Sequence, residues 1–250
     1  MNKSKVLIFV RYYLPGYKAG GPVVSISEFI NNLRKYLYFY IITSDRDFLD
    51  VKPYNNIKTN KWNRRFKVII NYFENNYYLY IRFILCLFYK KKFNIFYFSS
   101  LFDFKFTILP IFILKLLNYS EKRIIIAPRG ELYSGALRIK KNKKNLFLKI
   151  SKKINLFSNI VWHATSQEEK IIIQQVFPNS NVILAQNFFA SINVNNSYVN
   201  NRKRKGKLNI VYYSRITPKK NLKYCIKILS KTSIKFKMHI YGPIDDNKYW

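Results

Sequence analysis

Residues 209–222 read N-I-V-Y-Y-S-R-I-T-P-K-K-N-L, and this stretch is the most informative part of the chain. The apolar run at 210–213 predicts a buried strand, and Pro218 predicts a turn that leads into a helix. Arg215 and Lys220 then lie where that strand ends and the helix begins. Because cations and free helical N–H groups both attract anions, we expect Arg215 and Lys220 to bind a diphosphate. The alternative is an ordinary basic turn, since basic residues occur throughout the chain.

Short apolar runs alternate with helical patterns along the whole sequence. Strands are expected at 6–10, 39–43, 67–70, 95–98, 124–127, 160–164, 182–185, 208–213 and 236–241. Helices are expected from residue 22 onward and at 77–89, 104–117, 144–156, 167–175 and 222–229. Most strand runs are continuously apolar, which is typical of a parallel sheet covered on both faces. The predicted fold class is therefore α/β with a doubly wound sheet, in which ligands bind at the carboxyl ends of strands.

A polar, asparagine-rich and basic stretch interrupts this pattern and predicts a linker at 191–207. We therefore expect an N-terminal domain at 1–190 and a second domain that begins at residue 208. A domain usually needs about 100 residues or more. Residues 208–250 are thus expected to form only the beginning of the second domain.

Composition limits the kinds of protein and partner. Hydrophobic residues make up 49% of the 250 residues, which favours a buried core and excludes a disordered chain. The net charge of +33 indicates an anionic partner: nucleic acid, a membrane surface or a phosphorylated substrate. No basic run matches a nucleic-acid-binding module, so nucleic acid is not an expected partner. The apolar segments at 77–89 and 106–117 are shorter than the roughly 20 residues of a membrane span, and we expect buried or interfacial helices.

Few residues are of types that bind metals or form disulfides. Cys86 and Cys225 lack metal-ligand spacing, and we expect small buried side chains in a reducing compartment. The chain has two histidines, His163 and His239, so no metal site is expected.

Three further loops follow predicted strands and provide candidate ligand contacts. Gly20 and Gly21 allow close approach of the backbone, or else form a flexible turn. Arg129 and Glu131 offer a cation and an acceptor for sugar hydroxyls, or else form a surface ion pair of little energetic value. His163 ends a strand at the same edge, where it either lines the acceptor site or packs into the fold.

The segment after His163 also contains a helix-start signal. Ser166 and Glu169 have the spacing of a capping box, and we interpret them as a structural cap. Asn187 follows the next predicted strand, and the residue pattern alone assigns it no role.

Taken together, these segments resemble the family 4 glycosyltransferases, which are retaining nucleotide-sugar enzymes with the GT-B fold. The matching segments are L-P-G-Y-K-A-G-G-P, A-P-R-G-E-L-Y-S-G-A-L, W-H-A-T-S-Q-E-E, Q-N at 186–187, Y-S-R-I-T-P-K-K-N-L and I-Y-G-P at 240–243. The resemblance implies an N-terminal Rossmann-like domain that binds the acceptor and a C-terminal one that binds the nucleotide-sugar donor. It places Gly20 and Gly21 near the reaction centre and Arg215 and Lys220 on the donor diphosphate. No cofactor or metal is implied, because these two cations can supply the charge.

The sequence departs from the family pattern in two ways. Many members carry a glutamate pair spaced by seven residues, further into the C-terminal domain than residue 250. We therefore expect a truncated enzyme that is inactive by itself. A histidine also often stands at the position of Arg129, so the family's roles there do not transfer to this side chain.

The expected function is transfer of a sugar, with retention, from a nucleotide-sugar donor to a surface polysaccharide or lipopolysaccharide acceptor. The basic charge suggests a cytoplasmic protein that docks on the inner face of the cytoplasmic membrane, where lipid-linked acceptors reside. One alternative is a non-catalytic remnant or partner of a complete transferase, which an exposed apolar sheet edge near 236–241 would favour. A second alternative is a basic nucleic-acid-binding protein.

Overall fold

The computed structural model describes residues 3–90, 92–119, 123–188 and 208–250, apart from the side chain of Lys219. Contacts between Cα atoms divide the chain into two compact units, Met1–Ser191 and Ile192–Trp250. The expected linker at 191–207 lies outside the described residues.

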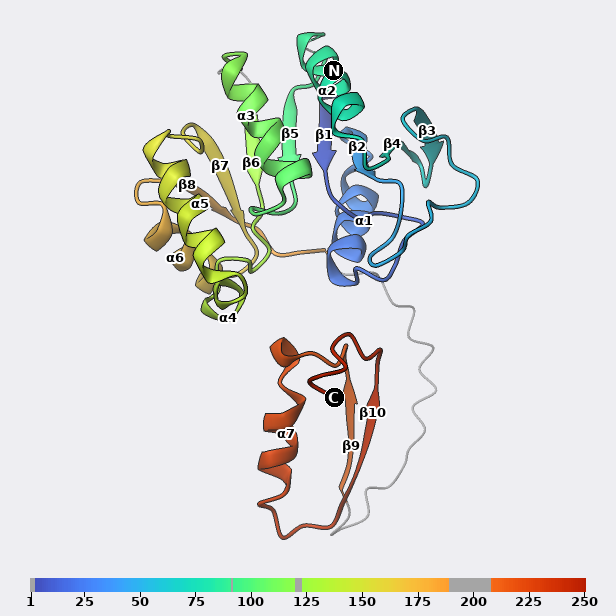
Figure 1. Cartoon of the computed structure of the whole chain (residues 1–250), viewed down its shortest axis with the longest axis vertical. Helices are drawn as coiled ribbons and strands as arrows, with labels where there is room; N and C mark the ends of the chain where they lie inside the picture. The colour runs from blue at the N-terminus through green and yellow to red at the C-terminus, as the bar shows by residue number, and fades with distance from the viewer. Residues whose placement is uncertain (1–2, 91, 120–122, 189–207) are drawn as a thin grey trace. The chain divides into compact units, whose positions relative to one another are not determined.

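The described part of the first unit contains one eight-stranded sheet in the order β3-β4-β2-β1-β5-β6-β7-β8 (Figure 1). The strands are β1 (Lys5–Phe9), β2 (Tyr38–Ser44), β3 (Trp62–Arg65), β4 (Val68–Phe73), β5 (Ile95–Phe98), β6 (Arg123–Ile126), β7 (Ile160–Ala164) and β8 (Asn181–Leu184). Neighbouring strands are parallel except for β3 and β4, which are antiparallel. This Rossmann-like α/β arrangement confirms the fold class predicted from the continuous apolar runs.

Helices connect the strands at nearly the expected places. They are α1 (Gly21–Leu33), α2 (Tyr77–Tyr89), α3 (Leu109–Leu116), α4 (Ser134–Arg138), α5 (Lys141–Lys153) and α6 (Gln167–Val176). The expected helix at 104–117 instead begins with a π-helical turn, Phe104–Ile108, before α3. The sequence pattern missed α4 and the short edge strand β3, because neither carries a clear apolar repeat.

The sheet is covered on both faces, and alternate residues of β1 point to opposite cores. Ile8 faces a core that includes Ile26 of α1. Leu7 faces the other core, which includes Ile84 of α2 and Ile111 of α3. Successive side chains of a strand point to opposite faces of the sheet, so neighbouring residues of β1 contribute to different cores.

The direction of the chain reverses between β1 and β5. From β1 the chain moves through α1 to β2 on one side, and from β5 it moves through α3 to β6 on the other. Crossovers between parallel strands are right-handed, so the two connections lie on opposite faces of the sheet. The carboxyl ends of β1 and β5 therefore form the switch point, which is where open α/β sheets bind ligands.

The second unit is a β-α-β element, as the restarted sequence pattern predicted. β9 (Leu208–Tyr213) and β10 (Phe236–Tyr241) pair in parallel, and α7 (Leu222–Leu229) connects them after a 3₁₀ turn at Pro218–Lys220. The loops that follow the two strands are held together, because the N–H of Ile216 donates to the carbonyl of Pro243 at 2.9 Å. Gly242 lies in this contact with a φ of 144°.

The two cysteines differ from their expected environment. Both are free thiols, which agrees with the absence of a disulfide, but Cys86 on α2 is exposed and Cys225 on α7 is only partly buried.

Candidate functional site

The loop that follows β1 is fixed by side chains from elsewhere in the first unit. One carboxylate oxygen of Asp47 accepts hydrogen bonds from the backbone N–H groups of Tyr17 and Lys18, at 2.8 and 3.0 Å. The hydroxyl of Tyr72 donates to the carbonyl of Leu14 at 2.7 Å. Asp47 and Tyr72 are both buried, so these bonds anchor the loop to the fold at the switch point.

Gly20 and Gly21 end this loop and begin α1. Gly20 has φ 72° and ψ −127°, a conformation that is essentially restricted to glycine. A β-carbon built on Gly20 or Gly21 meets no atom within 4 Å, so open space lies beside this backbone. The start of α1 therefore presents accessible backbone at the switch point, which suits an anion or a hydroxyl-rich ligand.

Arg129, in the loop after β6, connects several elements at the same edge. Its Nε donates to Ser99 after β5 at 3.2 Å, and its Nη1 donates to Ser25 of α1 at 3.1 Å and to Asn187 after β8 at 2.5 Å. Its Nη2 donates to the hydroxyl of Tyr97 at 3.1 Å. These bonds hold the guanidinium in a fixed plane, and one of its five N–H groups remains without a partner among the described residues.

Arg129 has a left-handed backbone conformation, with a φ of 54°. A non-glycine residue in this conformation costs about 1 kcal/mol or more. Four side-chain hydrogen bonds offset that cost and aim the guanidinium at the switch point. The expected alternative, a surface ion pair with Glu131, is wrong, because the two side chains bind different partners.

His163 receives a hydrogen bond from the arginine-bound tyrosine. The hydroxyl of Tyr97 lies 2.8 Å from Nδ1 of His163, and Nε2 lies 2.7 Å from the carbonyl oxygen of Ala185. Since a carbonyl only accepts, Nε2 carries the proton and Nδ1 accepts from Tyr97. Burial lowers the pKa of His163, and the charge on Arg129 lowers it further, so the ring is neutral near pH 7.

Glu131 supports the loop after β5. Its carboxylate accepts from the hydroxyl of Ser100 at 2.8 Å and from the N–H groups of Leu101 and Phe102 at 2.6 and 3.1 Å. Burial raises the pKa of Glu131, while these hydrogen bonds oppose the rise. The structure therefore uses this carboxylate to position the loop at 100–103, and its expected contact with sugar hydroxyls stays a prediction.

Glu169 shows why the expected capping box forms only in part. Ser166 caps α6 as predicted, because its hydroxyl accepts from the N–H of Glu169 at 3.1 Å. The buried carboxylate of Glu169 does not bind Ser166 in return. It accepts from the N–H groups of Thr165 and Gly130, at 2.8 and 2.7 Å, and so ties the loop of Arg129 to the start of α6.

The second unit places Arg215 and Lys220 in the turn between β9 and α7. Arg215 forms an ion pair with Asp245 at 3.1 Å, and its side chain is 42% exposed. Lys220 is exposed, and its carbonyl oxygen accepts from the hydroxyl of Tyr212 at 3.0 Å. Both cations lie at the carboxyl end of a parallel strand, but Arg215 already has a partner that an anion would have to displace.

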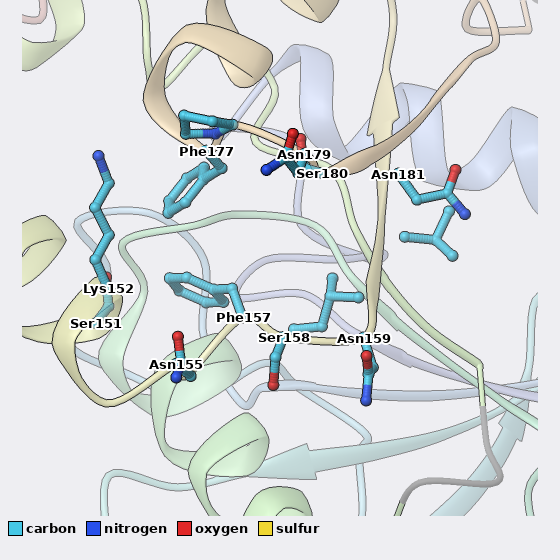
Figure 2. Close-up of a pocket in the computed structure, with 13 residues that line it drawn as sticks. Ser151, Lys152, Asn155, Phe157, Ser158, Asn159, Phe177, Asn179, Ser180 and Asn181 are labelled. Carbon is cyan, nitrogen blue, oxygen red and sulfur yellow. The ribbon is translucent and has the colours of Figure 1, made fainter.

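A cavity of about 540 Å³ lies at the opposite edge of the first unit's sheet, between the loops that precede β7 and β8 (Figure 2). Asn155, Asn159 and Asn179 line it and have φ values of 49°, 58° and 63°. Asparagine tolerates this left-handed conformation, so the turns account for these residues. The cavity also faces the amino ends of the strands, where ligands are not expected.

Within the described ranges, no group of histidine, cysteine, aspartate or glutamate side chains is arranged to hold a metal ion. None of the described helices is both long enough and apolar enough to span a bilayer. Comparison of the chain with protein-family models found no matching model, and comparison with curated proteins found no matching relative.

The structure brings Arg129 and His163 together through Tyr97 and places Gly20 and Gly21 at the same sheet edge. Sequence reasoning did not assign roles to Tyr97, Ser25, Ser99 or Asn187. The position of Tyr97 at the end of a predicted strand was a usable signal, since its hydroxyl had to find a buried partner.

Proposed function

We propose that the chain is a glycosyltransferase of the GT-B type that uses a nucleotide-sugar donor. The first unit would bind the glycan acceptor at the switch point, and the second would bind the donor diphosphate. The observation that carries the proposal is the turn between β9 and α7, where the partly exposed Arg215 and the exposed Lys220 lie in the segment that leads to a helix N-terminus. The Arg129 cluster and the open backbone at Gly20 and Gly21 provide a matching polar site in the first unit.

The reaction needs stabilisation of a departing diphosphate. In the proposed transfer, the bond between the anomeric carbon and the diphosphate oxygen breaks, and the nucleoside diphosphate keeps the electron pair. An acceptor hydroxyl oxygen bonds to the same face of that carbon, and its proton passes to the departing diphosphate. Fixed cations stabilise the charge that develops on the leaving group, which is the role proposed for Arg215 and Lys220.

Binding of nucleoside diphosphates tests this proposal directly. We expect UDP, GDP or ADP to bind the purified chain in isothermal titration calorimetry, without added metal. Arg215→Gln and Lys220→Gln should each weaken binding about tenfold or more, because a hydrogen bond to a charged group contributes about 1.5–3 kcal/mol. Lys231→Gln is the matched control, because it removes the same charge from an exposed site just beyond the carboxyl end of α7.

Two results would count against the proposal. One is that none of the three nucleotides binds. The other is equal weakening by Lys231→Gln, which would indicate general charge attraction. Salt-sensitive binding to DNA without any response to nucleotides would favour the nucleic-acid alternative.

A second candidate function is a non-catalytic partner of a complete transferase. β10 pairs only with β9 among the described strands, so its other edge has no partner there, and the strand carries the exposed side chains of Phe236 and Tyr241. An unpaired apolar edge tends to recruit another strand. Sedimentation velocity would show concentration-dependent assembly, and Phe236→Lys should reduce it if this edge is the contact.

A further inference from the structure

The helix α5 (Lys141–Lys153) has large apolar side chains on its solvent face. Leu146, Ile150 and the C-cap residue Ile154 are spaced by four residues, so they form one stripe along the helix. They are 59%, 49% and 53% exposed, respectively. A helix on a protein surface normally presents a polar outer face, so this stripe is unusual.

The opposite side of α5 already packs against the first unit. Leu148 and Ser151 are buried there, and Nζ of Lys144 donates to the carbonyl of Ala136 at 2.7 Å. The exposed stripe is therefore a second apolar surface and not the core-facing side of the helix.

The sequence interval that contains α5 carries charge of one sign. The sequence between Glu131 and Glu168 contains no aspartate or glutamate. Eight basic residues occur in that interval: Arg138, Lys140, Lys141, Lys143, Lys144, Lys149, Lys152 and Lys153. Lys143, Lys149 and Lys153 are exposed beside the stripe, and their long side chains can extend charge above an apolar contact.

We propose that the solvent face of α5, defined as Leu146, Ile150, Ile154 and the flanking lysines, docks on an anionic lipid bilayer. Apolar side chains in line among lysines are the features of helices that lie in the membrane interface. The lysines attract the headgroups, and the stripe enters the acyl boundary. The inference extends the membrane docking that the net charge of the sequence leads us to expect, and it names the surface responsible.

A second copy of the chain suits this face less well. In a two-fold contact the same patch meets itself, so the lysines of both copies would face one another without any carboxylate between them. Nucleic acid would satisfy the lysines but would leave the apolar stripe against phosphates.

Vesicle flotation of the full chain tests the proposal. The wild type should float with vesicles of phosphatidylcholine mixed with phosphatidylglycerol and should not float with phosphatidylcholine alone. The double variant Leu146→Gln/Ile150→Gln should lower the partition coefficient by about twentyfold, given the usual gain per apolar side chain. The double variant Lys149→Gln/Lys153→Gln should lower it about fivefold per lysine at low salt, and high salt should reduce this difference.

The matched control is Lys35→Gln/Val51→Gln, which alters an exposed lysine and an exposed aliphatic residue outside α5. It should bind vesicles as the wild type does. Far-UV circular dichroism checks that each variant is folded. The proposal would be overturned if the wild type did not float, or if the α5 variants floated as well as the control. It would also be overturned if the stripe variant changed only the sedimentation coefficient of the chain and left vesicle binding unchanged.

This readout is independent of the proposed sugar transfer. Vesicle binding needs neither a nucleotide nor an acceptor, and nucleotide binding is tested at Arg215 and Lys220 in the second unit. If one of the two proposals fails its test, the test of the other is therefore unaffected.

Discussion

Replacement of Arg129 by methionine tests the polar cluster at the switch point. Methionine keeps much of the side-chain length but removes four hydrogen bonds, to Ser25, Ser99, Tyr97 and Asn187. A bond that involves a charged group contributes about 1.5–3 kcal/mol. The acceptors here are neutral, and those of Ser25 and Asn187 are only partly buried, so we expect about half of the summed value. The free energy of unfolding should fall by about 3–6 kcal/mol.

Urea unfolding, followed by circular dichroism and tryptophan fluorescence, measures this change. Arg129→Lys keeps the charge but cannot reach all four acceptors, so its loss should lie between those of the wild type and Arg129→Met. Arg34→Met removes an exposed arginine at the end of α1 and should change stability by about 0.5 kcal/mol at most. A loss below about 1 kcal/mol for Arg129→Met would refute the view that these bonds organise the site.

Two further predictions concern stability. Gly242→Ala should destabilise the second unit by about 2–4 kcal/mol, because its β-carbon would lie 1.9 Å from the carbonyl oxygen of Ser214. The control is Gly135→Ala at an open helical site, which should be neutral or stabilising by about 0.5–1 kcal/mol. Equal changes in melting temperature for the two variants would contradict this reasoning. Burial lowers the pKa of Lys105 to about 8 from its ordinary 10.5, so the unfolded chain binds more protons between these values. The free energy of unfolding should therefore rise with pH from about 8 towards 10, and Lys105→Met should flatten that slope in urea titrations.

The sequence predicted most of the sheet because its strands are buried on both faces. Runs such as 95–98 and 124–127 are apolar at every position, and their short length favours a buried strand over a helix. The edge strand β3 reads W-N-R-R, and only its antiparallel pairing with β4 defines it. Whether this segment forms a strand therefore depends on tertiary contacts, which the preferences of its four residues do not reveal.

The candidate site was predictable at the level of loops but not of hydrogen bonds. Parallel topology brings the carboxyl ends of β6 and β7 to the same edge, so Arg129 and His163 were expected near each other. Their link through Tyr97 depends on side-chain directions that spacing does not fix. The same limit explains Glu169, whose carboxylate binds Gly130 across a long sequence separation instead of completing the local cap.

The hydrogen bonds around Tyr97 run in one direction. Nε2 of His163 donates to a carbonyl, its Nδ1 accepts from Tyr97, and the tyrosine oxygen accepts from Arg129. The acceptors of the cluster are thus used by its own donors, while one N–H group of Arg129 has no partner among the described residues. The site should therefore select its ligands by polarity. Oxygen-rich anions and sugars can accept a hydrogen bond from Arg129, whereas a ligand with a protonated amine would be repelled by the guanidinium charge.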